Sequence, residues 1–117
     1  MAGLGSLRFS GRREVRELLT RGRPLRTGLG RAVWNRPPSP WGTGILFVVS
    51  KKVSKRSTER NRIRRQLTEA FRKRWRERPF AIRAVVYVSP AVLRLTGRER
   101  RALALEFIGR LAILAGY

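Results

Sequence analysis

The strongest constraint on the fold is a basic helical pattern that lies between two short apolar segments. Residues 45–49 read Ile-Leu-Phe-Val-Val, and residues 82–88 are also mainly apolar. Both have the length and β-branched character of strands that are buried on both faces. Between them, residues 58–78 carry apolar side chains at helical spacing and Arg on the opposite side. This strand–helix–strand order predicts an α/β (α+β) two-layer sandwich with a small central sheet.

The central helix is expected to begin with Thr58 as its cap and to end before Pro79. One face should pack against the sheet, because its apolar residues recur every three or four positions. These residues are Ile63, Leu67, Ala70, Phe71 and Trp75.

The rest of the chain predicts weaker elements around this unit. A short amphipathic helix is expected over residues 10–21, capped by Ser10, and a short strand around residues 32–34. Residues 36–44 are rich in Pro and Gly and predict a loop. A final helix is expected over residues 98–114, with one apolar face formed by Leu103, Phe107, Leu111 and Leu114.

Length and composition favour one folded domain over residues 1–117, with flexible ends that include about residues 1–7. The chain has 28 basic and 7 acidic residues, a net charge of +21. Such a chain either has an anionic partner or tolerates a strong positive field, and nucleic acid is the best candidate partner because basic side chains release its condensed counterions. Arg accounts for 24 of the basic residues, and its planar guanidinium binds phosphate in a bidentate manner.

The residue types that are missing exclude several classes of function. The chain contains no Cys, His or Asp, so disulfides, thiolate zinc sites and most acid–base or metal-dependent catalytic sites are excluded. We therefore expect no catalytic residue and no metal ligand in the protein. With neither a signal-peptide pattern nor a membrane span in the sequence, the expected location is cytoplasmic, without membrane binding.

The highest density of charge lies in residues 51–78, which contain 13 basic and 3 acidic residues. These basic residues begin in a predicted loop and continue into the first turns of the central helix. Phosphate groups bound there would meet Arg side chains, backbone N–H groups and the positive end of the helix dipole together. The segment therefore predicts an RNA-binding surface.

Three motifs in this segment resemble the signature of the bacterial ribonuclease P protein subunit. They are Val49-Ser50-Lys51-Lys52-Val53, Arg60-Asn61-Arg62-Ile63-Arg64-Arg65 and Glu69-Ala70-Phe71-Arg72. Because the three motifs follow one another without gaps in the family's spacing, the match is specific.

The resemblance implies a fold of order α-β-β-β-α-β-α with a left-handed crossover through the basic helix. It also implies the function: an accessory subunit that binds the catalytic RNA of ribonuclease P and the 5′ leader of precursor tRNA. The RNA would carry out the cleavage that removes the leader and would need Mg²⁺, whereas the protein alone would be inactive and would bind no cofactor. No DNA specificity is expected.

Carried over residue by residue, the resemblance implies two binding surfaces. The surface for the catalytic RNA would consist of Lys51, Lys52, Lys55, Arg56, Arg60, Asn61, Arg62, Arg64, Arg65 and Arg72. The cleft for the leader, between the first helix and the sheet, would contain Val15, Leu19, Trp34 and Phe47. Val15 and Leu19 occupy positions where the family often has Phe, which predicts weaker stacking of leader bases.

Two other readings fit the composition. A structural RNA-binding protein such as a ribosomal protein would have the same size and charge, but it would not stimulate cleavage of precursor tRNA. A cationic protein on an anionic membrane surface would need an exposed apolar helix face opposite its Arg residues. The apolar stripe of the 58–78 helix is more simply explained as core, because two predicted buried strands flank this helix.

Overall fold

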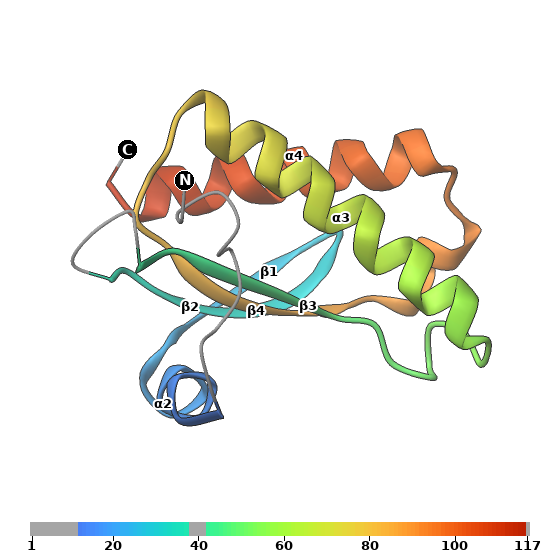
Figure 1. Cartoon of the computed structure of the whole chain (residues 1–117), viewed down its shortest axis with the longest axis horizontal. Coiled ribbons are helices and arrows are strands. Elements are labelled where there is room, and N and C mark those ends of the chain that lie inside the picture. Colours follow the sequence, from blue (N-terminus) through green and yellow to red (C-terminus); the bar gives the residue numbers. More distant parts are fainter. Residues whose placement is uncertain (1–11, 38–41, 117) are drawn as a thin grey trace.

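Four strands form one mixed sheet in the order β1-β2-β4-β3 (Figure 1). The computed structural model describes residues 12–37 and 42–116. Its strands are β1 Arg23–Thr27, β2 Gly30–Asn35, β3 Gly44–Val48 and β4 Arg83–Val88. Its helices are α2 Arg12–Arg21, α3 Ser57–Glu77, α4 Gly97–Leu114 and the 3₁₀ helix η2 Pro90–Arg94.

The strand pairing confirms the predicted order of elements, α-β-β-β-α-β-α. β1 and β2 form an antiparallel hairpin, and β2 also pairs antiparallel with β4. β3 lies parallel to β4, so the chain must cross over between them, and α3 forms this connection. The left hand of the crossover stays a prediction.

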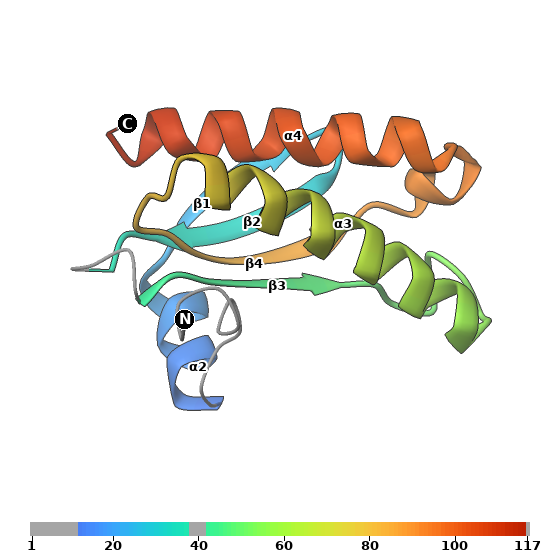
Figure 2. The same ribbon diagram turned by 45° about the horizontal axis from the view of Figure 1, so that its top comes forward.

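Helices α3 and α4 pack side by side on one face of the sheet, and α2 lies against the other face (Figures 1 and 2). The predicted apolar stripe of α3 is buried in full, as expected. Strand residues that alternate along the sheet meet this stripe and the apolar face of α4. They are Ala32, Trp34, Ile45, Phe47, Ala84, Val86 and Val88.

Helix α2 covers only part of the opposite face. Leu18 of α2 and Val85 of β4 are each 1% exposed, although neither belongs to the core beneath α3 and α4. Gly22 ends the helix where it closely approaches β2, since a Cβ there would lie 2.4 Å from Cγ1 of Val33. Leu46 of β3 lies beyond this cover and is 38% exposed. The prediction that residues 45–49 are buried on both faces is therefore wrong.

The helix termini differ from the prediction for α3. Its N-cap is Arg56, which makes no side-chain capping hydrogen bond, and Thr58 lies inside the first turn. Thr58 is therefore not the cap. Helix α4, in contrast, begins with a capping box, in which Oγ1 of Thr96 accepts from Glu99 N at 3.2 Å and Glu99 Oε1 accepts from Thr96 N at 2.9 Å.

Other differences are local. The hydrophobic pattern did not indicate strand β1, which only the family resemblance implied, and on α4 the predicted apolar residue Leu114 is 50% exposed. Ser10, residues 1–7 and the centre of the 36–44 loop lie outside the described residues. Within the described ranges, no helix is long and apolar enough to cross a bilayer.

Candidate nucleic-acid interface

The loop between β3 and α3 presents basic side chains on a tight turn. Ser50 O accepts from Val53 N at 3.0 Å and from Ser54 N at 3.4 Å, and Ser50 Oγ accepts from Lys52 N at 3.2 Å. Val53 and Ser54 point inward and are buried, whereas Lys51 and Lys52 are exposed. The turn thus directs both ammonium groups into solvent.

A hydrogen-bond network fixes this loop against the first turn of α3. Ser54 Oγ donates to Glu59 Oε1 at 2.5 Å and accepts from Arg56 N at 3.2 Å. Arg60 Nη1 donates to the carbonyl oxygens of Ser54 and Lys55, each at 3.0 Å. Arg60 therefore holds the loop in place, a positioning contact that the sequence motif did not indicate.

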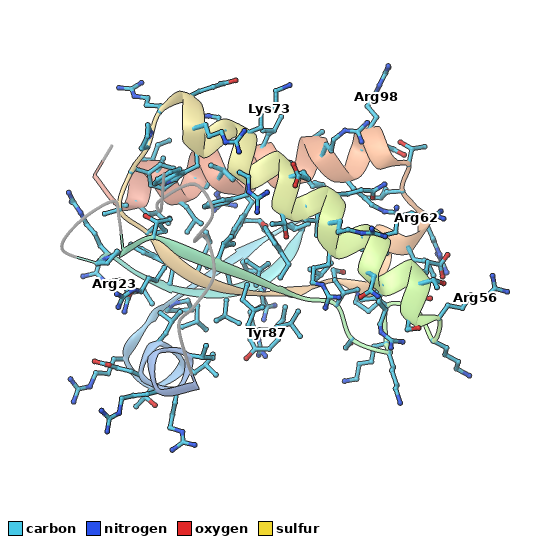
Figure 3. The ribbon with its side chains drawn as sticks, viewed as in Figure 1. Arg23, Arg56, Arg62, Lys73, Tyr87 and Arg98 are labelled. Carbon is cyan, nitrogen blue, oxygen red and sulfur yellow. The ribbon has the colours of Figure 1, made fainter. Side chains whose placement is uncertain are left out.

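The ten residues predicted to bind the catalytic RNA form one continuous segment of loop and helix, here called the basic surface. Eight of them are exposed: Lys51, Lys52, Lys55, Arg56, Asn61, Arg62, Arg64 and Arg65. Arg60 and Arg72 are half-buried. Figure 3 shows Arg56 and Arg62 projecting from the first turns of α3.

Little of this charge is neutralised within the protein. In the described part of the chain from Ser50 to Arg78, the salt bridge is Arg72 Nη1 to Glu69 Oε1 at 3.2 Å. Arg64 Nη2 donates to the amide oxygen of Asn61, which orients both side chains but leaves the charge of Arg64 intact. The positive end of the α3 dipole adds to this potential. The basic surface is thus suited to phosphate.

Of the four residues predicted to form the leader cleft, two are accessible beside the sheet and two lie in the core. Leu19 on α2 is 43% exposed and Val15 is half-buried, so both are accessible beside the sheet. Trp34 and Phe47 are 4% and 2% exposed and belong to the core under α3 and α4. Placing them in a cleft beside α2 was wrong, because strand alternation directs them to the opposite face of the sheet.

Other residues take their place on the α2 side. Tyr87 lies between the core residues Val86 and Val88, so it faces away from the core and is half-buried. Its ring lies 5.3 Å from the guanidinium carbon of Arg31, the residue opposite it on β2. Figure 3 shows Tyr87 on the side of the sheet that carries α2. Alternation along β4 predicts that Tyr87 lies on the face opposite Val86 and Val88, but it does not predict which face stays open. We call Val15, Leu19, Arg31, Leu46 and Tyr87 the open face.

Comparison with known proteins decides the family. The sequence profile described as Ribonuclease P matches residues 7–111. This chain belongs to the ribonuclease P protein family. As a ribonuclease P protein, it is a component of a tRNA-processing ribonucleoprotein and has an RNA partner. No match was found among curated protein sequences.

Solved structures support the same fold for this ribonuclease P protein. The RNase P protein of Staphylococcus aureus superposes with a TM-score of 0.75 at 17% identity, covering 95% of this chain and 99% of that one. The protein of Thermotoga maritima gives 0.75 at 20% identity, with 88% and 96% covered. At these identities the structures establish the shared fold.

Proposed function

We propose that the basic surface binds the catalytic RNA of ribonuclease P, and that the open face contacts the 5′ leader of precursor tRNA. The protein thereby helps the RNA to remove the leader during maturation of the tRNA 5′ end. The observation that carries this proposal is the row of exposed, largely uncompensated basic side chains along the 51–56 loop and the start of α3.

The geometry supports RNA as the ligand of the basic surface. Its side chains project from a loop fixed by Arg60 and from a single helix, so the backbone that carries them is already ordered. An ordered backbone loses less conformational entropy on binding than a flexible one does. Arg62 and Arg65 lie three positions apart on α3 and therefore project from the same side of the helix.

The open face supports contact with single-stranded leader bases. Single-stranded nucleic acid binds where aromatic side chains stack on bases and basic side chains contact the backbone. Tyr87 and Arg31 supply one of each across neighbouring strands, and the aliphatic Leu19 and Leu46 lie on the same side of the sheet. Tyr87 thus offers the aromatic ring that Val15 and Leu19 lack.

Cleavage is assigned to the RNA. The chain contains no His, Asp or Cys, and its described residues contain no group of three or more His, Cys, Asp or Glu placed to hold a metal ion. Mg²⁺ required for cleavage would accordingly be held by the catalytic RNA. The protein contributes binding and orientation of the substrate.

The test is cleavage of precursor tRNA at low Mg²⁺ with protein alone, with a bacterial catalytic RNA alone and with both. We expect activity from the combination and none from the protein. RNA binding without stimulation of cleavage would instead identify a structural RNA-binding protein. Activity from the protein after complete removal of RNA would overturn the assignment of cleavage to the RNA.

Substitutions on α3 test whether the basic surface binds the catalytic RNA. Arg62→Ala and Arg65→Ala should each weaken binding of the catalytic RNA and lower the slope of log K against log salt by about 0.7 to 0.9. Arg98→Ala is the matched control, because Arg98 is also exposed but lies in the first turn of α4. Equal effects from all three variants would mean that only net charge matters and that the basic surface is not the binding site.

A further inference from the structure

A second arginine-lined site lies at the other end of the molecule from the first turn of α3. A pocket of about 460 Å³ opens between the end of α2, the paired ends of β1 and β2, and the C-terminal end of α4. It is lined by Arg21, Arg23, Trp34, Asn35, Arg36, Leu114, Ala115 and Gly116. Figure 3 shows Arg23 and Arg56 at opposite ends of the longest axis of the protein.

Trp34 forms part of the pocket wall and is itself almost fully buried. It is 4% exposed, and its indole Nε1 makes no hydrogen bond within residues 12–37 and 42–116. This nitrogen is enclosed by protein atoms, so Trp34 lines the pocket through its other atoms. Trp75 shows the usual arrangement, since its Nε1 donates to Phe80 O at 2.8 Å.

Arg23 is held in position over this indole. Arg23 and Trp34 are directly opposite on β1 and β2, and the guanidinium carbon of Arg23 lies 5.8 Å from the centre of the ring. A guanidinium that stacks on an aromatic ring retains its N–H donors at its edge for other partners. The cross-strand pair therefore places a positive charge in the lining of the pocket.

The negative end of α4 does not cancel this charge. Arg36 Nη1 donates to Ala115 O at 2.8 Å and so compensates the carbonyl groups at the helix C-terminus. Gly116 has φ of 93°, and a Cβ there would lie 3.2 Å from Arg36 Nη1. The tight turn lets α4 end against Arg36, while Arg21 and Arg23 remain exposed. The described residues that line the pocket include no acidic side chain.

We propose that this pocket binds a phosphodiester group of an RNA strand, with Arg21 and Arg23 contacting the phosphate oxygens. The choice of RNA rests on the proposed function, whereas the anion site itself rests on the pocket alone. The protein then contacts its RNA partner at two separate ends, through the basic surface and through this pocket.

The first test uses the indole N–H signals of the full chain in ¹H–¹⁵N spectra, with the Trp34 signal assigned from Trp34→Phe. The protein is titrated with inorganic phosphate and, separately, with a six-nucleotide single-stranded RNA. Both should move the Trp34 signal and leave the Trp75 signal in place, and the RNA should saturate at lower concentration. A Trp34 signal that neither probe moves would overturn the proposal. Movement with phosphate alone would mean a site for free anions, which overturns the RNA assignment.

The second test compares Arg23→Gln with Arg26→Gln, which removes the same charge from an exposed residue of β1 outside the pocket. At 0.1 M salt, Arg23→Gln should weaken binding of the catalytic RNA about five- to eightfold, the effect of one lost phosphate contact. Arg26→Gln should weaken it clearly less. Unchanged unfolding midpoints establish that both variants fold.

The outcomes separate the two proposals. Equal weakening by Arg23→Gln and Arg26→Gln, with RNA binding otherwise intact, would overturn the pocket and leave the proposed function standing. If the wild-type chain does not bind catalytic RNA at all, the proposed function fails. The phosphate titration then tests the anion site alone, and the RNA assignment of the pocket is overturned together with the function.

Discussion

The two faces of the sheet are built from the same strands, yet they have opposite properties. Phe47 is 2% exposed beneath α3 and α4, whereas its neighbour Leu46 is 38% exposed on the open face. Trp34 and Tyr87 differ in the same way, one in the core and one half-buried beside α2. Apolar side chains along β3 and β4 thus form the core on one face and stay partly accessible on the other.

The two faces differ because different amounts of helix cover them. A face closed by α3 and α4 excludes water from every core strand position. A face covered at one end by the ten-residue α2 leaves Leu46 and Tyr87 accessible. The amount of helix on each face therefore decides which side chains stay accessible.

The largest effect that tests this comparison is on stability. Phe47→Ala should lower the free energy of unfolding by about 3–5 kcal/mol, because it opens a cavity in the core. Leu46→Ala, the adjacent residue on the open face, should lower it by less than about 1 kcal/mol. Urea unfolding of the two variants measures both values. Similar losses would show that the two faces are equally buried in solution.

The next effect is on substrate binding. Tyr87→Ala should weaken binding of precursor tRNA to the assembled ribonucleoprotein by about 1–3 kcal/mol, the contribution of one base stacked on an aromatic ring. Tyr87→Phe, which keeps the ring, should bind nearly as wild type. Mature tRNA, which lacks a leader, should be insensitive to both. A loss of the same size for mature tRNA would place Tyr87 outside the leader site.

A smaller effect concerns the helix that closes the core face. Thr96→Ala removes the α4 cap and should lower the free energy of unfolding by about 1 kcal/mol. Thr58→Ala is the control: it should have little effect, because Thr58 lies inside α3 and does not cap it. Thermal unfolding distinguishes them. A larger loss for Thr58→Ala would mean that Thr58 is the cap and that α3 begins two residues later in solution.

The smallest effect is a pH dependence at the same cap. Hydrogen bonds from the backbone and the side chain of Thr96 lower the pKa of Glu99 below its usual value. A lowered folded-state pKa contributes stability above the unfolded pKa, and this contribution is lost as the pH falls through the folded pKa. Glu99→Gln should therefore be less stable than wild type at neutral pH and equal to it in acid. A difference that persists in acid would come from packing.

Much of the basic surface could be predicted because its signal is local. The stripe of α3 follows from helical periodicity, and the exposure of Arg62 and Arg65 follows from their place opposite that stripe. The role of Arg60 was not visible, because it donates to carbonyl oxygens of Ser54 and Lys55, and a sequence motif does not show backbone contacts.

The sequence by itself determined the order of the elements, the buried face of α3 and the position of the excess charge. Each of these depends on residues that are neighbours along the chain. The tertiary structure alone decided which face of the sheet Trp34, Phe47 and Tyr87 occupy, and it brought Arg21, Arg23 and Ala115 together around one pocket. Those arrangements depend on strand register and on the helix that packs on each face. Both are set by contacts between distant parts of the chain.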